Sequence, residues 1–150
     1  MVSITVPDNY GAVIALALGA IPFLSFMQGN VVTTLRKDAR VPYPHHYATQ
    51  EQCKTNPKAE QFNCAQRAHG NLLENMSQTM LYILVAGLKW PRATTAIGLV
   101  WLVSRMAYAY GYIYSGKTSG RMYGASFWLC QGALWGMSVF GVGGELLNFF

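Results

Sequence analysis

Hydrophobic residues form long runs along this chain, and polar residues gather between the runs. The first run extends from Asn9 to Leu35 without a single Asp, Glu, Lys or Arg. It exceeds the roughly 20 apolar residues that a helix needs to cross a bilayer. Its basic residues, Arg36, Lys37 and Arg40, follow it. This order is typical of an uncleaved membrane anchor rather than of a cleaved signal peptide.

Three further runs predict three more membrane helices. The second, Asn75 to Leu88, is too short to span alone, so its helix must extend back through Arg67. The third run contains one charge, Arg105, and the fourth stops at Glu145. We therefore predict an all-α fold, an integral-membrane four-helix bundle in a single domain of residues 1–150. The predicted spans are residues 9–33, 66–88, 93–115 and 122–144, each to within a few residues.

Composition and charge fit a membrane protein better than a nucleic-acid binder. Charged residues make up 11% of the chain, against roughly a quarter in soluble domains. The basic residues behind the net charge of +5 lie mainly in the connections between apolar runs, eight in the first and third together and two in the second. By the positive-inside rule the first and third connections face the cytosol and both termini lie on the other side.

Polar residues also occur inside two predicted spans, where charge is costly and marks function by default. At helical spacing each set lines one face. Arginine suits carboxylates through paired hydrogen bonds, and a lone glutamate suits an amine. The pattern predicts a small zwitterion with more carboxylates than amines, such as glutathione. The residues are Arg67, Asn71 and Glu74 on the second helix and Arg105, Tyr108 and Tyr112 on the third.

A purely structural interpretation stays open for these residues. Arg67 and Glu74 could pair within the bundle, Arg105 could bond to Glu74 or to backbone carbonyls, and the tyrosines could form an interfacial belt. Trp128 and Trp135, at i and i+7 on the fourth helix, predict either a groove for a lipophilic second substrate or simple packing.

The cysteines and histidines predict neither a disulfide framework nor a metal site. No CxxC pair occurs, so the three cysteines are expected to be free thiols. The spacing of cysteine and histidine matches no zinc pattern, and we expect no metal. The residues considered are Cys53, Cys64, Cys130, His45, His46 and His69.

One stretch, FNCAQRAHGNLLE from Phe62 to Glu74, resembles the signature of the membrane-associated eicosanoid and glutathione metabolism (MAPEG) family. It is most similar to the microsomal glutathione transferase type 3 branch. The segments RMAYAYGY (Arg105 to Tyr112) and VPYP resemble that branch's third helix and cytosolic loop. The resemblance covers nearly the whole chain. It implies a homotrimer of four-helix subunits, with a glutathione site at each subunit interface.

The resemblance also implies roles for individual residues. Arg121 matches an arginine that stabilises the glutathione thiolate, since a nearby cation favours the charged form of a thiol. His69 points about 200° away from Arg67 on an ideal helix, toward a neighbouring interface. Asn75 stands where leukotriene C4 synthase has a tyrosine, which weakens a leukotriene assignment. The glutathione-holding residues implied by the match are Arg36, Arg67, His69, Asn71, Glu74, Tyr108 and Tyr112, and the spacing adds Arg105.

The expected function is therefore that of a membrane-bound glutathione transferase with glutathione peroxidase or leukotriene C4 synthase-type activity. Its expected partners are glutathione, a lipophilic electrophile or lipid hydroperoxide, and membrane lipids. The expected location is the endoplasmic reticulum membrane, with the mitochondrial outer membrane as an alternative. Two other functions stay open: a non-catalytic lipid-presenting protein and a structural subunit of a larger membrane complex.

Overall fold

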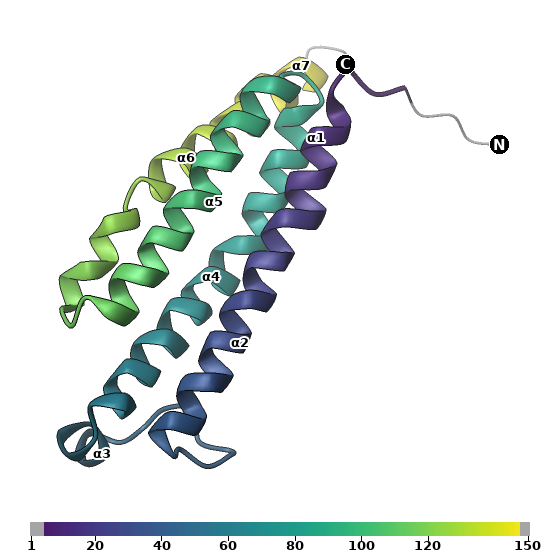
Figure 1. Ribbon diagram of the computed structural model, residues 1–150. Helices are drawn as coiled ribbons and strands as arrows, with labels where there is room; N and C mark the ends of the chain where they lie inside the picture. The colour runs from purple at the N-terminus through teal and green to yellow at the C-terminus, as the bar shows by residue number, and fades with distance from the viewer. Residues whose placement is uncertain (1–4, 148–150) are drawn as a thin grey trace. The chain divides into compact units, whose positions relative to one another are not determined.

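The fold, taken from a computed structural model that describes residues 5–147, is built from helices (Figure 1). No strand occurs in this range, which confirms the predicted all-α class. The elements in chain order are α1 (Tyr10–Ile14), the π-helical η1 (Ala15–Ala20), α2 (Ile21–Ala39), α3 (Gln50–Thr55), α4 (Pro57–Gly87), α5 (Pro91–Tyr114), the 3-10-helical η2 (Thr118–Gly124), α6 (Phe127–Gly136), the π-helical η3 (Met137–Gly143) and α7 (Gly144–Leu147).

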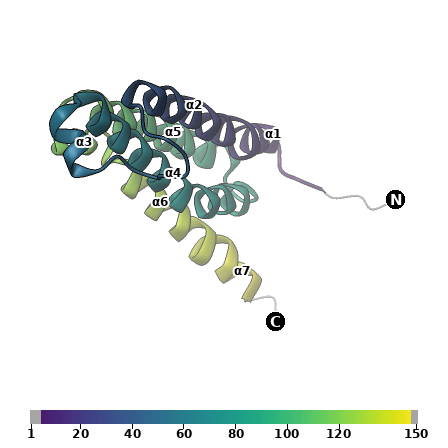
Figure 2. The ribbon, with the colours of Figure 1, turned by 90° about the horizontal axis from the view of Figure 1, so that it is seen from below.

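The chain divides into two compact units that share its long helices. Unit 1 contains Met1–Pro22, Met76–Val103 and Ser126–Phe150, and unit 2 contains Phe23–Asn75 and Ser104–Ala125. Helices α2, α4 and α5 therefore each contribute to both units. Within unit 2, α2 and α4 lie side by side in both views, with α3 at their common end (Figures 1 and 2).

Prolines and a capping box set several helix ends. Pro57 and Pro91 occupy the first positions of α4 and α5, where a missing N–H has no intrahelical partner to lose. The hydroxyl of Thr49 accepts a hydrogen bond from Gln52 N–H, and the Gln52 side chain accepts one from Thr49 N–H. This reciprocal pair starts α3. After α2, Arg40 adopts a φ of 57° and turns the chain into the connection.

Unit 1 is held together by close helix packing. A Cβ added at Gly98 of α5 would lie 2.5 Å from Cδ2 of Leu16 in η1, so a larger residue here would force the Leu16 side chain to shift. The hydroxyl of Tyr10 donates to the Leu84 carbonyl at 2.8 Å and ties α1 to α4. Trp101 of α5 is fully buried.

Unit 2 has an apolar core contributed by α2, α4 and α5. Leu35, Phe62 and Ala109 are among its buried members, one from each helix. The η2 segment packs directly on α5, because a Cβ at Gly124 would lie only 2.0 Å from the Ser104 carbonyl oxygen. The backbone of η2 is thus fixed against α5 at this point.

The observed helix bounds differ from the predicted spans. Helix α2 continues to Ala39, past the predicted end at residue 33. Helix α4 begins at Pro57, before the predicted start at residue 66. The predicted fourth span is instead divided into η2, α6 and η3. Across the described residues one helix, Tyr10–Ala39, is long and apolar enough to cross a membrane by length and composition. The four-span arrangement stays a prediction.

Candidate functional site

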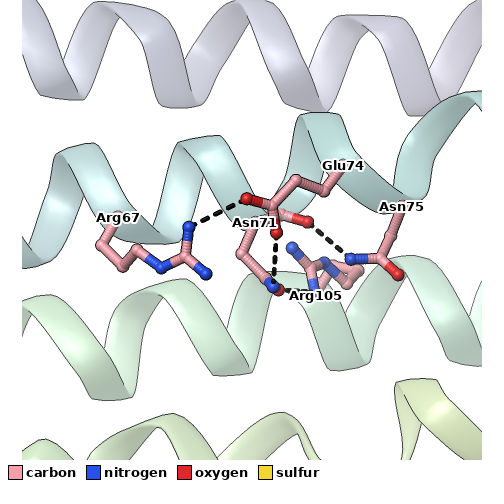
Figure 3. Close-up of polar contacts among 5 residues, drawn as sticks. All are labelled: Arg67, Asn71, Glu74, Asn75 and Arg105. Carbon is pink, nitrogen blue, oxygen red and sulfur yellow. Dashed lines mark hydrogen bonds and ion pairs between the residues drawn. The ribbon is translucent and has the colours of Figure 1, made fainter.

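Three side chains on one face of α4 form an ion pair extended by an amide. Arg67 Nη1 donates to Glu74 Oε1 at 2.9 Å, and Asn71 Nδ2 donates to Glu74 Oε2 at 3.3 Å (Figure 3). The spacing of i, i+4 and i+7 places all three residues on the same helical face. The ion pair is open to its surroundings, since the Arg67 and Glu74 side chains are 51% and 54% exposed.

Helix α5 adds a buried arginine to this set. Arg105 is 1% exposed, and its Nη1 donates to Asn71 Oδ1 at 2.8 Å. Its guanidinium also lies over the Tyr108 ring, 5.0 Å from the ring centroid. A buried cation requires such partners, because desolvation of a charge is costly.

Asn71 is the centre of the network. Its amide oxygen accepts from Arg105, its amide nitrogen donates to Glu74, and its backbone carbonyl accepts from Asn75 Nδ2 at 2.8 Å (Figure 3). Four side chains from two helices are thereby linked to it directly or through Glu74. Two guanidinium groups and one carboxylate leave the cluster with one excess positive charge, which favours an anionic ligand.

A cavity of about 660 Å³ in unit 2 opens beside this network, with Arg67 and Tyr112 in its wall. This volume lies within the range of roughly 300–1,000 Å³ that small-molecule sites occupy. Tyr108 and Tyr112 pack edge to face, with ring centroids 6.0 Å apart. A second cavity of about 690 Å³ shares Cys64 and Tyr112 with the first.

Asn63 and Cys64 shape the cavity, although the sequence suggested no role for either. Asn63 Oδ1 accepts from Ala48 N–H at 2.8 Å, and its Nδ2 donates to the Ala48 carbonyl at 3.0 Å. These two hydrogen bonds attach the connection of residues 40–48 to α4. Burial, reinforced by the charges of Glu60 and Cys53, raises the pKa of the Cys64 thiol. Both residues belong to the FNC motif, and this motif is the sequence feature from which their place in the cavity wall could have been predicted.

Arg36 lies apart from the network and is held by the connection that follows α2. It is 8% exposed, and its Nη1 donates to the His45 carbonyl at 2.6 Å. Its guanidinium lies between two aromatic rings, 4.5 Å from the centroid of Tyr43 and 4.7 Å from that of Phe62. The structure therefore gives Arg36 a local bracing contact and does not bring it to Arg67.

His69 and Arg121 also lie outside the network. His69 faces Gly29 of α2, since a Cβ at Gly29 would lie 3.9 Å from its Nε2. Its Nδ1 is buried and has no hydrogen-bond partner in the part of the chain that the structure describes. Arg121 is exposed on η2. His69 therefore keeps an unsatisfied buried atom, and the Arg121 side chain lies within electrostatic reach of Tyr112.

The two tryptophans belong to unit 1. Trp128 and Trp135, together with Tyr82 and Gln131, line a shallow depression of about 230 Å³. Both indoles are largely exposed, at 58% and 45%. No group of three or more His, Cys, Asp or Glu side chains within residues 5–147 is arranged to hold a metal ion.

Fold and site together define an all-helical protein with an arginine-rich polar cluster beside a cavity. The MAPEG family model matches residues 14–140 of the chain. The chain is therefore a member of the MAPEG family, a membrane-associated family that typically includes glutathione transferases and related proteins. The match identifies no branch within the family.

Proposed function

We propose that this protein is a membrane-bound glutathione transferase and glutathione peroxidase of the type 3 branch, acting as a homotrimer in the endoplasmic reticulum membrane. The observation that carries the proposal is the network of Arg67, Asn71, Glu74 and Arg105 beside the cavity in unit 2. Its excess positive charge suits glutathione, which has two carboxylates and one ammonium group.

Binding glutathione requires Arg67 and Glu74 to exchange partners. An exposed ion pair contributes only about 0–1 kcal/mol to stability, and this pair is about half exposed. A bidentate arginine–carboxylate bond to the ligand can replace it at little cost. In the bound state Arg67 takes a ligand carboxylate, Glu74 takes the ammonium group, and Arg105 with Asn71 keeps the frame in place. Tyr108 and Tyr112 supply neutral hydrogen bonds.

In this scheme Arg121 stabilises the thiolate. Arg36 and His69, which lie outside the Arg67 network, also bind glutathione. The thiolate attacks an electrophilic carbon, forms the carbon–sulfur bond and expels the leaving group with its electron pair. With a lipid hydroperoxide, it attacks the terminal oxygen and yields an alcohol and glutathione sulfenic acid. A second glutathione then gives the disulfide and water.

The mitochondrial outer membrane is the alternative location for this protein.

The proposal is tested by the ultraviolet thiolate band of bound glutathione in purified protein. The wild type is expected to show this band at neutral pH. Arg121→Ala is expected to raise the glutathione pKa by roughly two units and reduce the thiolate fraction at pH 7 from about three quarters to about 3%, whereas Arg67→Ala should lose glutathione binding. Arg92→Ala is the control, since Arg92 is exposed at the start of α5 and no role is assigned to it.

A wild-type protein that binds no glutathione would refute the proposed activity. A persistent thiolate band in Arg121→Ala would refute only the role of Arg121. One observation favours a second function, that of a non-catalytic lipid-presenting protein: Arg67 and Glu74 already satisfy each other. Lipid binding without a thiolate band would support this second function.

A further inference from the structure

The second cavity of unit 2, of about 690 Å³, opens where α4 begins and α5 ends, and two lysines are in its wall. Lys58 lines this lysine cavity from the first turn of α4, and Lys117 lines it from the connection after α5. Glu60 is the one carboxylate among the described lining residues. The wall therefore carries one excess positive charge, which favours an anionic group.

The charges of the two lysines are not neutralised by ion pairs between residues 5 and 147. Lys58 Nζ donates to Gln61 Oε1 at 3.2 Å, and this acceptor is neutral. Gln61 Nε2 in turn donates to the Ile113 carbonyl at 3.5 Å, which joins the start of α4 to the end of α5. Ser119 adds a hydroxyl to the wall. Two ammonium groups beside neutral hydrogen-bonding groups suit a phosphate.

An apolar groove of about 200 Å³ among α2, α4 and α5 adjoins the lysine cavity. Ile113 and Tyr114 are in the walls of both. The α5 residues that line the groove follow the i, i+3, i+4, i+7, i+8 pattern from Met106 to Tyr114 and so share one helical face. They cover roughly 12 Å along the helix axis, which is close to the roughly 15 Å of hydrocarbon in one bilayer leaflet.

Charged and apolar lining residues follow one direction along the helices. On α4 the residues of the lysine cavity end at Cys64, and Ala65, the next residue, lines the groove. The rings of Tyr110 and Tyr114 pack together at the α5 end of the groove, with centroids 5.3 Å apart. Tyrosine is the residue expected at the level of lipid headgroups. Apart from the Gln28 amide and these two hydroxyls, the described groove wall presents hydrocarbon and thioether groups.

We infer that the lysine cavity and the groove together bind one anionic phospholipid of the cytosolic leaflet. Its phosphate lies between Lys58 and Lys117, and one acyl chain lies along α5 toward Met106. Both lysines belong to segments that the positive-inside rule places in the cytosol, and the cytosolic leaflet is the one rich in anionic lipids. This lipid is a bound component and not a substrate, so the inference goes beyond the proposed function and requires no glutathione chemistry.

Equilibrium binding to the full-length chain in detergent tests the inference. The probes are radiolabelled dioleoyl phosphatidylinositol and dioleoyl phosphatidylcholine, which share their acyl chains and differ in headgroup charge. The wild type is expected to bind the anionic lipid about fivefold more tightly, as one excess positive charge provides. Lys58→Gln and Lys117→Gln should each remove this preference and leave phosphatidylcholine binding unchanged.

Lys37→Gln is the matched control for charge. Lys37 is exposed in the last turn of α2 and lines neither the lysine cavity nor the groove. Its substitution changes the net charge equally and should keep the preference. An equal loss in Lys37→Gln would assign the effect to overall charge and overturn the inference. So would equal wild-type affinities for the two lipids.

Two further measurements test the acyl chain. Met106→Trp, at an exposed position in the groove wall, should weaken binding of both lipids, and unchanged binding would contradict the groove assignment. Glycerophosphoinositol, the headgroup without chains, should compete poorly. Competition as strong as that of the whole lipid would instead indicate a site for a soluble phosphate. Dissociation of an assembled oligomer by Met106→Trp, seen by size-exclusion chromatography, would show that a second copy of the chain covers the groove and would refute lipid binding there.

Discussion

The thiol of Cys64 is an ionisable group outside the predicted spans whose pKa is raised, first by burial and then by the charges of Glu60 and Cys53. A thiol with a raised pKa is protonated at neutral pH, and only the thiolate is nucleophilic. We expect Cys64 to react slowly with maleimide at pH 7 and faster as the pH rises beyond the ordinary thiol range. The measurement is the alkylation rate against pH in a chain whose other cysteines are serine.

Glu60→Gln tests how much the charge of Glu60 contributes to the raised pKa of Cys64. Removal of one nearby negative charge lowers the thiol pKa and should raise the alkylation rate at pH 8 roughly two- to threefold. Glu51→Gln, at an exposed carboxylate of α3, should leave the rate unchanged. An equal acceleration in both variants would assign the effect to net charge instead of to Glu60.

At this scale the sequence predicted residue spacing well and non-local contacts poorly. The i, i+4, i+7 positions of Arg67, Asn71 and Glu74 do place them on one face, since helical geometry alone dictates it. Whether this network binds glutathione stays a prediction. The contacts of Arg36 with Tyr43 and Phe62 were not predicted, because they depend on how the connection folds back.

At the scale of elements, Gly124 determines how closely η2 approaches α5. A Cβ there would lie 2.0 Å from the Ser104 carbonyl oxygen, a backbone atom that cannot swing aside. Gly124→Ala should therefore destabilise the protein by about 1–3 kcal/mol, the usual cost of overpacking. Thermal unfolding in detergent, followed by circular dichroism, measures the loss.

Gly132→Ala is the control for this substitution. Gly132 lies within α6 and has no atom within 4 Å of an added Cβ. Alanine there should leave stability unchanged or raise it by up to about 1 kcal/mol, because glycine disfavours the helix. Equal destabilisation by both substitutions would contradict the packing argument.

Helix type was predictable from the sequence, but helix ends and breaks were not. An apolar run shows only the part of a helix that is buried or faces lipid. A prediction based on such runs therefore ends a helix at its first polar residues, even where the helix continues. The polar extensions to Ala39 and from Pro57 follow from local capping and from packing on the connection. The interruption between Gly124 and Phe127 lies in an apolar stretch, where composition carries no signal.

At the scale of the whole molecule, the resemblance implies a trimer whose sites each draw residues from two neighbouring subunits. Arg36 is held away from Arg67 within one chain, so the two arginines would serve one site from different subunits, and two inactive variants should restore each other. We expect co-expressed Arg67→Ala and Arg36→Ala chains to recover about one quarter of the wild-type sites by random assembly in a closed ring. Glutathione conjugation per purified trimer is the measurement.

Co-assembly of Arg67→Ala with the double variant should restore nothing, because no chain then supplies Arg67. Recovery in that control would point to contamination. No recovery in the first mixture, although mixed trimers are demonstrated by two affinity tags, would place both arginines in the site of a single subunit.

The π-helical segments η1 and η3 change how the surface of this protein should be mapped. A wider turn holds more residues than an α-turn, so side chains after Ala20 and after Gly143 are rotated relative to a regular helix. A helical wheel drawn through residues 10–39 at constant pitch would therefore assign some lipid-facing positions to the interior. Cysteine-scanning or cross-linking experiments should start a fresh angular count at Ile21.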